Sequence, residues 1–355
     1  MIYIYTQDFP NRRASCVHVT GLCEAFSRLE ETDLFVLNIN GYPLNYIKSF
    51  GIQELSLKHK FNILRSEDLI ITRSIKYAIL YSLLGRDTIL DIHADASEWR
   101  PLHRAIIRFL SPLLVKRLKV SVITKSLQNS IFLLFERYKV KVIPDASVDF
   151  LQKSCLSINK VEQFLEDFEQ SVIGYCGSFN PGKGVSLVLD LAEKMPLYPF
   201  IVVGGDESDL IDVRKILIDR GINNVFLSGY VPNSHVQNYL NFMDICLLPN
   251  RREVFVNGRK TDIGSHTSPL KLFEYFSMGK AVIASDIEVL KEVLDDKRNC
   301  LLVDPEDIKL WVHAIESLAN NEQLAETLRC AARKDFETKY SWTVRANNLK
   351  VLNAG

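Results

Sequence analysis

Short apolar segments alternate with longer segments of helical periodicity along almost the whole chain, and this alternation is the feature that most limits the possible folds. It is typical of parallel sheets whose strands are joined by crossover helices. The strands expected in the first half are Ile2–Tyr5, Leu34–Asn38, Leu69–Thr72, Thr88–Ile92, Val120–Thr124 and Val140–Ile143. Those expected in the second half are Val172–Cys176, Phe200–Val203, Val225–Ser228, Ile245–Leu248, Ala281–Ser285 and Cys300–Val303. Two sheets of about six strands each suit this length better than one very large sheet.

A polar, acidic stretch without a strand pattern, residues 151–170, separates the two halves. We interpret it as a linker region with one short helix around Val161–Phe168. The sequence therefore predicts an α/β protein with one Rossmann-like domain over residues 1–150 and a second over residues 171–335. Residues 336–355 are predicted to form a C-terminal helix that packs back towards the N-terminal domain.

Charge and cysteine usage restrict the possible partners and location. The formal net charge is zero, so the chain lacks the overall basic charge of a nucleic-acid-binding protein, and we expect no nucleic-acid partner. The 7 cysteines are scattered without a C-x-x-C pair, which argues against a disulfide framework or a zinc site. The N-terminus has no signal-peptide pattern and no apolar run approaches the roughly 18 residues that span a bilayer, so we expect a cytoplasmic protein.

A glycine-rich turn, GYCGSFNPGKG at residues 174–184, lies between an expected strand and an expected helix over Val185–Lys194. Glycines let backbone N–H groups approach a phosphate, and the N-terminus of the following helix favours an anion. The spacing from Gly177 to Lys183 matches a P-loop, but Gly184 stands where a Ser or Thr would hold magnesium. The alternative is a tight strand-to-helix turn in which Lys183 is an ordinary surface residue.

A second segment, residues 267–280, has a strongly marked helix start. Ser268 suits the N-cap and Pro269 the first helical position, so the free N–H groups there form an anion site. Lys271 opposes the helix dipole in that first turn, and a bound phosphate would compensate for it. Glu274 lies one turn further on, where its carboxylate could accept hydrogen bonds from vicinal hydroxyls. The alternative is an exposed helix glutamate that pairs with Lys271.

With these two segments the chain resembles the family-4 glycosyltransferases, which are retaining enzymes of the GT-B fold. The most specific match is SPLKLFEY at residues 268–275, and weaker matches are FIVVGG at 200–205, FLSGYVP at 226–232, DICLLP at 244–249 and YSW at 340–342. The GT-B fold consists of two Rossmann-like α/β/α domains that face each other across a cleft. The resemblance thus implies an acceptor-binding N-terminal domain and a C-terminal domain that binds a nucleotide sugar.

The resemblance also implies roles for individual residues. Lys183 would contact the donor diphosphate, the backbone amides of 268–271 would bind it, and Glu274 would hold the ribose. His93, at the end of the strand Thr88–Ile92, would lie beside the reacting sugar, although a lone histidine there is otherwise often structural. The implied catalytic residues are His93, Lys183 and Glu274. The implied donor-binding residues are Gly177, Ser178, Lys183, Gly204, Gly229, Tyr230, Val231, His266, Ser268, Pro269, Leu270, Lys271 and Glu274.

Two positions depart from the family pattern. The usual E-x7-E pair would need a glutamate where this chain has His266, a position that normally helps to bind the donor sugar. Ser178 stands where many members have a basic residue after the first glycine. Lys183 and Lys271 would then carry more of the diphosphate charge, with help from Arg251, Arg252 or Arg259.

Basic residues also mark two places in the N-terminal half. The loop Phe9–Ser15 would face the acceptor, with Arg12 and Arg13 as candidates for an anionic acceptor. From Arg100 to Lys141 there are ten Lys or Arg residues interleaved with apolar ones, and Glu136 is the one acidic residue. We interpret Arg100–Lys119 as a possible peripheral contact with anionic membrane on the cytoplasmic face, with an ordinary amphipathic crossover helix as the alternative.

The sequence therefore predicts a retaining, metal-independent glycosyltransferase of the hexosyltransferase type, with no cofactor besides the nucleotide sugar as co-substrate. Enzymes of this class use a UDP- or GDP-type donor and a glycan or lipid-linked acceptor. We therefore expect a role in surface polysaccharide or glycoconjugate biosynthesis. A sugar-nucleotide epimerase of the same fold and a non-catalytic nucleotide-sugar-binding protein are the alternatives.

Overall fold

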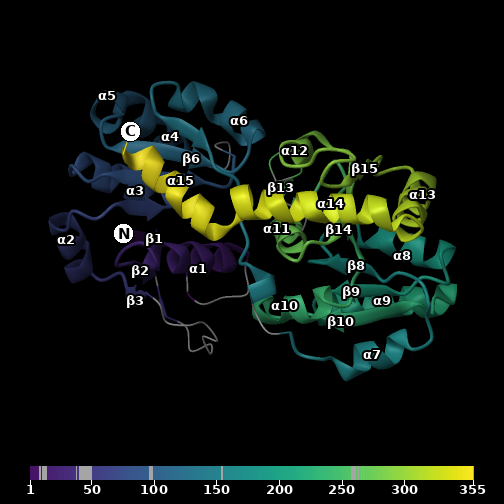
Figure 1. Cartoon of the computed structure of the whole chain (residues 1–355). Helices are drawn as coiled ribbons and strands as arrows, with labels where there is room; N and C mark the ends of the chain where they lie inside the picture. Colours follow the sequence, from purple (N-terminus) through teal and green to yellow (C-terminus); the bar gives the residue numbers. More distant parts are fainter. Residues whose placement is uncertain are drawn as a thin grey trace. The chain divides into compact units, whose positions relative to one another are not determined.

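The computed structural model describes residues 1–7, 9, 14–36, 38–39, 50–95, 99–152, 155–256, 261–262, 264, 266 and 268–354. They form two compact units (Figure 1). Unit 1 comprises Met1–Ala146 together with Trp342–Gly355, and unit 2 comprises Ser147–Ser341. Within the described residues, no helix is both long enough and apolar enough to cross a membrane.

Unit 1 contains a 7-stranded parallel sheet in the order β3-β2-β1-β4-β5-β6-β7. Its strands are β1 (Ile2–Tyr5), β2 (Asp33–Val36), β3 (Gly51–Glu54), β4 (Ile70–Thr72), β5 (Thr88–Ile92), β6 (Leu118–Val122) and β7 (Val140–Val142). Its helices are α1 (Ala14–Ser27), α2 (Leu57–Arg65), α3 (Ile75–Leu83), α4 (Pro101–Phe109), α5 (Ser111–Leu114), α6 (Lys125–Phe135) and α15 (Trp342–Ala354). The strand order reverses beside β1, and ligands of such sheets bind beyond the carboxyl ends of the strands.

The helix α15 is part of unit 1 although unit 2 separates it from the rest of that unit in sequence. It packs against α1 (Figure 1). The approach is close at Gly21, where an added Cβ would lie 2.2 Å from Nε1 of Trp342. A larger side chain at position 21 would therefore push the two helices apart.

Unit 2 contains a 6-stranded parallel sheet in the order β10-β9-β8-β11-β14-β15, and β12 and β13 form a separate antiparallel pair. The strands are β8 (Ile173–Cys176), β9 (Phe200–Val203), β10 (Val225–Gly229), β11 (Ile245–Leu248), β12 (Phe255–Val256), β13 (Thr261–Asp262), β14 (Ala281–Ser285) and β15 (Leu301–Val303). The α-helices are α7 (Asn159–Leu165), α8 (Val185–Lys194), α9 (Glu207–Arg220), α10 (Asn233–Leu240), α11 (Leu270–Ser277), α12 (Glu288–Lys291), α13 (Ile308–Ala319) and α14 (Glu322–Asp335). A 3-10 turn, η2 (Phe150–Gln152), and a π-helical turn, η3 (Phe336–Tyr340), complete it.

Two hydrophobic cores lie on opposite faces of the unit 2 sheet. Phe200 and Val202 of β9 belong to the core that includes residues of α8 and α13, whereas Ile201 and Val203 belong to the core that includes residues of α11. Successive side chains of a strand point to opposite faces, so the sheet is covered by helices on both sides. This is the α/β/α arrangement predicted from the sequence, and the two parallel sheets confirm that fold class.

Three features differ from the predictions. The edge strand β3 was missed because its sequence, GIQE, has one strongly apolar residue. Residues 151–170, predicted as a linker region, lie within unit 2, where Val161 is fully buried in a core cluster. The residues predicted as one C-terminal segment are divided, since 336–341 lie in unit 2 and α15 lies in unit 1.

Candidate functional site

Glycines follow three neighbouring strands of unit 2 at their carboxyl ends. Gly177 follows β8, Gly204 follows β9, and Gly229 ends β10. The N–H of Gly204 donates to the carbonyl of Gly229 at 2.9 Å, and the N–H of Gly177 donates to the carbonyl of Val203 at 2.7 Å. Gly204 has φ +126°, and an added Cβ would lie 1.8 Å from the carbonyl oxygen of Gly177. These turns therefore pack backbone against backbone, which leaves no room for side chains between them.

The turn after β8 leads into α8 through Gly184, which has φ +86° and caps the helix. An added Cβ at Gly184 would lie 1.9 Å from the carbonyl oxygen of Pro249. Position 184 thus has no space for the hydroxyl side chain that a P-loop needs for magnesium. Lys183, one residue before, is half-buried, and burial lowers its pKa to about 8.

Lys271 lies in the first turn of α11 and reaches the glycine turn of β8. Its Nζ lies where a Cβ of Gly177 would be, at 1.2 Å from that position, so the glycine is required for this approach. The same Nζ is 3.4 Å from the hydroxyl of Tyr175 and 4.6 Å from the centre of the Tyr175 ring. Burial first, and the charge of Lys183 second, lower the pKa of Lys271 to about 7. A bound anion would offset the repulsion between these two lysines, so the arrangement is chemically suited to one.

Glu274, one turn further along α11, is buried with 7% of its surface exposed. It is therefore not the exposed glutamate of the alternative interpretation. Asn233, at the start of α10, donates a hydrogen bond from Nδ2 to its Oε1 at 2.6 Å. Burial raises the pKa of Glu274, while the hydrogen bond from Asn233 and the charge of Lys271 oppose that rise. Sequence reasoning missed Asn233; the available signal was a polar residue directly after the segment Gly229–Pro232.

The start of α11 lies one residue later than predicted. Pro269 is the N-cap and Leu270 the first helical residue, so Ser268 precedes the N-cap position that was predicted for it. An extended backbone at Pro269, with ψ 104°, moves the helix start beyond it. His266 is buried, and Thr267 lies outside the described residues.

The arginines that were expected to help neutralise the diphosphate differ in their surroundings. Arg251 donates to the carbonyl of Pro305 at 2.9 Å and pairs with Glu306 at 2.5 Å, so its guanidinium is already engaged. Arg252 is exposed. Arg259, and the loop residues Arg12 and Arg13, lie outside the described residues.

His93 belongs to unit 1 and follows β5, as predicted. Its Nε2 lies 2.9 Å from Oδ2 of Asp91, and its ring meets the ring of His18 edge to face at 4.4 Å between centres. Burial first, and the charge of Arg73 second, lower the pKa of His93. At neutral pH the imidazole is therefore uncharged.

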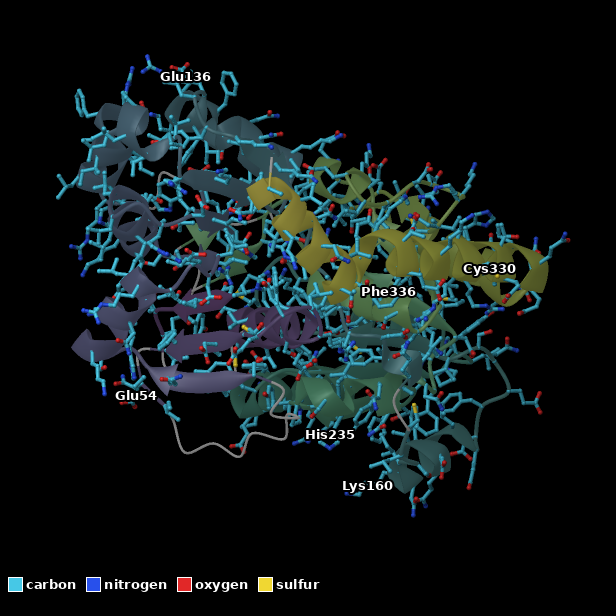
Figure 2. The ribbon with its side chains drawn as sticks, turned by 60° about the vertical axis from the view of Figure 1, so that its left-hand side comes forward. Glu54, Glu136, Lys160, His235, Cys330 and Phe336 are labelled. Carbon is cyan, nitrogen blue, oxygen red and sulfur yellow. The ribbon has the colours of Figure 1, made fainter. Side chains whose placement is uncertain are left out.

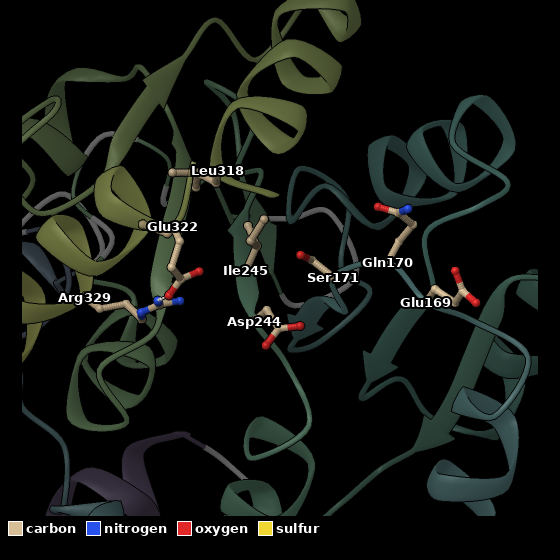
Figure 3. A pocket seen from close by; sticks show the side chains of 9 residues that line it. Glu169, Gln170, Ser171, Asp244, Ile245, Leu318, Glu322 and Arg329 are labelled. Atoms are coloured by element: carbon tan, nitrogen blue, oxygen red, sulfur yellow. Dashed lines mark hydrogen bonds and ion pairs between the residues drawn. The ribbon is translucent and has the colours of Figure 1, made fainter. Parts of the chain in front are cut away.

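A cavity of about 260 Å³ opens at the amino ends of the central strands of the unit 2 sheet (Figure 3). Its lining residues are Glu169, Gln170, Ser171, Asp244, Ile245, Leu318, Glu322, Ala325 and Arg329. Ser171 precedes β8 and Ile245 begins β11, so the cavity lies at the amino ends of these strands. The glycine turns lie at the carboxyl ends, so this cavity is separate from the candidate site.

Comparison with known proteins supports the relationship inferred from the sequence. Residues 170–321 match the family described as Glycosyl transferases group 1. An uncharacterized glycosyltransferase of Methanocaldococcus jannaschii is 26% identical over 171 residues, which are 47% of this chain and 43% of that protein. The O-antigen chain mannosyltransferase C of Escherichia coli is 25% identical over 183 residues, or 51% of this chain and 46% of that protein. The chain thus matches less than half the length of each of these two relatives.

Among solved structures, HepE of Anabaena in complex with UDP superposes with a TM-score of 0.73 at 14% identity, and the match covers 100% of both chains. The fold is that of the GT-B glycosyltransferases. The family match lies within unit 2, the unit that carries the glycine turns and α11. Together these findings confirm the resemblance and support a family-4, or group 1, glycosyltransferase of the GT-B fold.

Proposed function

We propose that the protein transfers a sugar from a UDP- or GDP-type nucleotide sugar to a glycan or lipid-linked acceptor, with retention of anomeric configuration. The observation that carries the proposal is the placement of Lys183 and Lys271 at the glycine turn of β8, with Glu274 one helical turn beyond Lys271. Two cations suit a diphosphate, and a buried carboxylate suits the vicinal hydroxyls of a ribose. The HepE structure that shares this fold contains UDP.

The site residues take the following roles in this proposal. Lys183 and Lys271 neutralise the diphosphate, which the backbone N–H groups of Ser178, Ser268, Leu270 and Lys271 also approach. The N–H groups of Gly177 and Gly204 already donate to the carbonyls of Val203 and Gly229, so these two glycines contribute space for the ligand and no hydrogen bond. Glu274 accepts hydrogen bonds from the ribose, and residues 229–231 line the base. His266 takes the place of a family glutamate beside the sugar. His93 accepts a hydrogen bond from a sugar hydroxyl.

In the proposed reaction the bond between the anomeric carbon and the phosphate oxygen breaks, and the acceptor oxygen bonds to the same face of the sugar. The acceptor proton passes to the departing phosphate. Negative charge develops on the diphosphate, so the lysines and N–H groups stabilise the transition state without a metal. A reaction of this kind serves surface polysaccharide or glycoconjugate synthesis, and the relative from Escherichia coli carries the name of an O-antigen enzyme.

The second part of the proposal is a peripheral contact with anionic membrane on the cytoplasmic face through Arg100–Lys119. Leu102 and Phe109 are spaced seven residues apart on α4 and are 67% and 80% exposed, and Leu113 of α5 is 64% exposed. Arg104, Arg108 and Lys116 are exposed on the same segment. Apolar side chains that enter the headgroup region beside basic ones are typical of interfacial helices. Glu136, the one acidic residue of Arg100–Lys141, follows directly after α6 and not on α4 or α5 (Figure 2).

A panel of nucleotide sugars tests the transferase proposal. The correct donor raises the melting temperature, because it binds only the native state. Incubation with and without acceptors then distinguishes the alternatives: an epimerase converts the donor alone, a binding protein converts nothing, and the transferase consumes the donor in an acceptor-dependent manner. No melting shift with any nucleotide sugar would contradict the proposal.

A further inference from the structure

A buried cluster of charged and polar side chains lies under His93 in unit 1. Arg345 of α15 is 1% exposed and Asp91 of β5 is fully buried. His18 of α1 is 2% exposed, and Asp145, just after β7, is 5% exposed. Charged groups are expensive to bury, so their arrangement needs an explanation beyond packing.

Arg345 is the centre of this cluster. Its Nη2 donates to both oxygens of Asp91, each at 2.9 Å, and its Nη1 contacts the carbonyl oxygens of Ile143 and Pro144. One guanidinium therefore joins the end of β5 to the segment after β7. Ser121 of β6, the residue opposite Asp91 in the pairing of β5 with β6, donates to Oδ1 of Asp91 at 2.7 Å.

These contacts determine the charge of Asp91. Burial alone would raise its pKa, but the charge of Arg345 and the hydrogen bond with His93 outweigh burial and hold the pKa well below the usual range. An ionised carboxylate accepts hydrogen bonds and donates none. At the 2.9 Å contact with Oδ2, Nε2 of His93 must therefore be the donor.

Burial is the largest influence on His93 and lowers its pKa. The charge of Arg73 acts in the same direction, the charges of Asp91 and Asp145 act against it, and the net result is a lowered pKa. In a neutral imidazole, one protonated nitrogen leaves the other with a lone pair. Here Nε2 holds the proton, so Nδ1 is the acceptor, 3.8 Å from Oδ1 of Asp145.

His18, Asp91 and His93 also place one potential metal-ligand atom each within 4.8 Å of one another. A divalent cation at that point would lie against Arg345, which already donates to both oxygens of Asp91. The repulsion between the two positive charges, together with these occupied acceptors, favours the hydrogen-bonded cluster over a metal centre.

We propose that Arg345 is a positioning residue: through Asp91 it fixes His93 as the Nε2–H tautomer and leaves Nδ1 as an acceptor for a hydroxyl of the substrate. The tautomer follows from unit 1 alone. The assignment of the hydroxyl rests on the proposed transfer of a sugar.

The tautomer is measured directly by long-range ¹H–¹⁵N correlation spectra of the full-length protein, in which the 7 histidines are few enough to resolve. The His93→Gln variant assigns the His93 signals. We expect a protonated Nε2 and an unprotonated Nδ1 between pH 6.5 and 8. A protonated Nδ1 in the unaltered protein would overturn the proposal.

Two variants test whether Arg345 and Asp91 fix the tautomer of His93. In Asp91→Asn the amide oxygen remains with Ser121 and Arg345, so the NH₂ group faces His93 and reverses its tautomer. In Arg345→Gln the buried carboxylate loses its cation, takes up a proton and donates it towards Nε2, with the same reversal. Arg345→Lys keeps the positive charge beside Asp91 and should keep the original tautomer. Lys350→Gln, a control on the same helix, leaves Arg345 in place and should keep that tautomer too. If Arg345→Gln does not fold, Asp91→Asn still tests the positioning role, because asparagine has nearly the same shape as aspartate and the variant should fold.

Kinetics give a second readout with the nucleotide sugar that raises the melting temperature most. Asp91→Asn should lower kcat at least about tenfold, the worth of one hydrogen bond, and leave the affinity for the nucleoside diphosphate unchanged. An unchanged tautomer in both variants would overturn the positioning role. Reversed tautomers in a protein that binds no nucleotide sugar would instead leave that role intact and contradict the proposed function.

Discussion

Asn233 donates a hydrogen bond of 2.6 Å to Oε1 of Glu274, across 41 residues of sequence. Glu274 is buried, so a partner for one oxygen is needed to keep its carboxylate ionised against the effect of burial. The hydrogen bond also fixes the rotation of the carboxylate. The second oxygen then has a defined direction in which to accept a ligand hydroxyl.

This relationship predicts a graded response to the ribose. UDP should bind the unaltered protein about tenfold more tightly than 2′-deoxy-UDP, the worth of one hydrogen bond, if uracil is the base. Glu274→Ala should bind the two nucleotides equally. In Asn233→Ala the ratio of the two affinities should lie between that of Glu274→Ala and that of the unaltered protein. Calorimetric titration measures this, with GDP and its 2′-deoxy analogue in parallel and Asn241→Ala, an exposed residue after α10, as the control. Equal discrimination by Glu274→Ala and the unaltered protein would refute the ribose assignment.

The lysine pair predicts proton uptake on nucleotide binding. The pKa values of Lys183 and Lys271, about 8 and about 7, leave both partly neutral at pH 8, and a diphosphate favours their charged forms. Affinity should therefore fall as the pH rises from 7 to 9, a range in which the phosphate itself does not titrate. Titration calorimetry at pH 8 in two buffers of different protonation enthalpy counts the protons. Lys271→Met should take up fewer protons, and no uptake by the unaltered protein would contradict the lysine assignment.

The stability of the unliganded protein should rise with pH, whereas its affinity for the nucleotide should fall. The pKa of Lys271 in the folded state lies below its usual 10.5, so the unfolded chain binds more protons between about pH 7 and that value. The free energy of unfolding contributed by this lysine then rises with pH across the same window. Urea unfolding at pH 7 and pH 9, compared between the unaltered protein and Lys271→Met, isolates this contribution.

Lys183→Ala should weaken the nucleoside diphosphate by about 1.5–3 kcal/mol, the range for a hydrogen bond to a charged group. Excess EDTA should leave the affinity of the unaltered protein unchanged, since Gly184 offers no hydroxyl for a metal. Lys194→Ala, at the exposed end of the same helix α8, is the matched control and should bind normally. Loss of binding in EDTA would favour a metal-dependent site instead.

The basic and apolar surface of α4 and α5 predicts sedimentation with phosphatidylserine vesicles at low salt. Reversing the charges of Arg104, Arg108 and Lys116 to Glu should abolish it, because each basic residue near such a surface contributes about 1 kcal/mol. Reversal of Arg214 and Lys215, exposed on α9 of unit 2, provides the control. If the unaltered protein stays in the supernatant, the membrane contact is wrong.

Gly204→Ala should destabilise unit 2 by about 3 kcal/mol, because the new Cβ meets a carbonyl oxygen and the backbone has a left-handed φ. Gly221→Ala is the matched comparison: its φ is +67° but nothing lies within 4 Å of the added Cβ. Gly221→Ala should lower the free energy of unfolding by only about 1 kcal/mol, the cost of the left-handed backbone conformation alone. Thermal unfolding distinguishes the two; equal losses would show that the contact with Gly177 contributes nothing.

The sequence was most informative where short-range physics decides structure. Central strands such as Thr88–Ile92 and Ala281–Ser285 are buried along their whole length, and their apolar runs gave the correct bounds. The edge strand β3 has no such run, and the start of α11 depended on a backbone angle at Pro269 that propensity does not specify.

Long-range polar pairs could not be predicted. Asp91 appears in the sequence as one acid in an apolar strand, and Arg345 as one basic residue of a polar helix, 254 positions later. Their hydrogen bonds depend on how α15 packs, which no local pattern encodes. The same holds for Asn233, whose partner Glu274 lies on a different helix.

The insertion of unit 2 between Ala146 and Trp342 has a consequence for synthesis on the ribosome. When the first 146 residues emerge, Asp91 has no guanidinium to neutralise it, and the surface of α1 around Gly21 has no Trp342 to cover it. Unit 2 is contiguous and can fold as soon as it is made, whereas unit 1 must wait for its final helix. The part of the chain translated first is therefore the last to reach its native state, and it is the part exposed longest to chaperones and proteases.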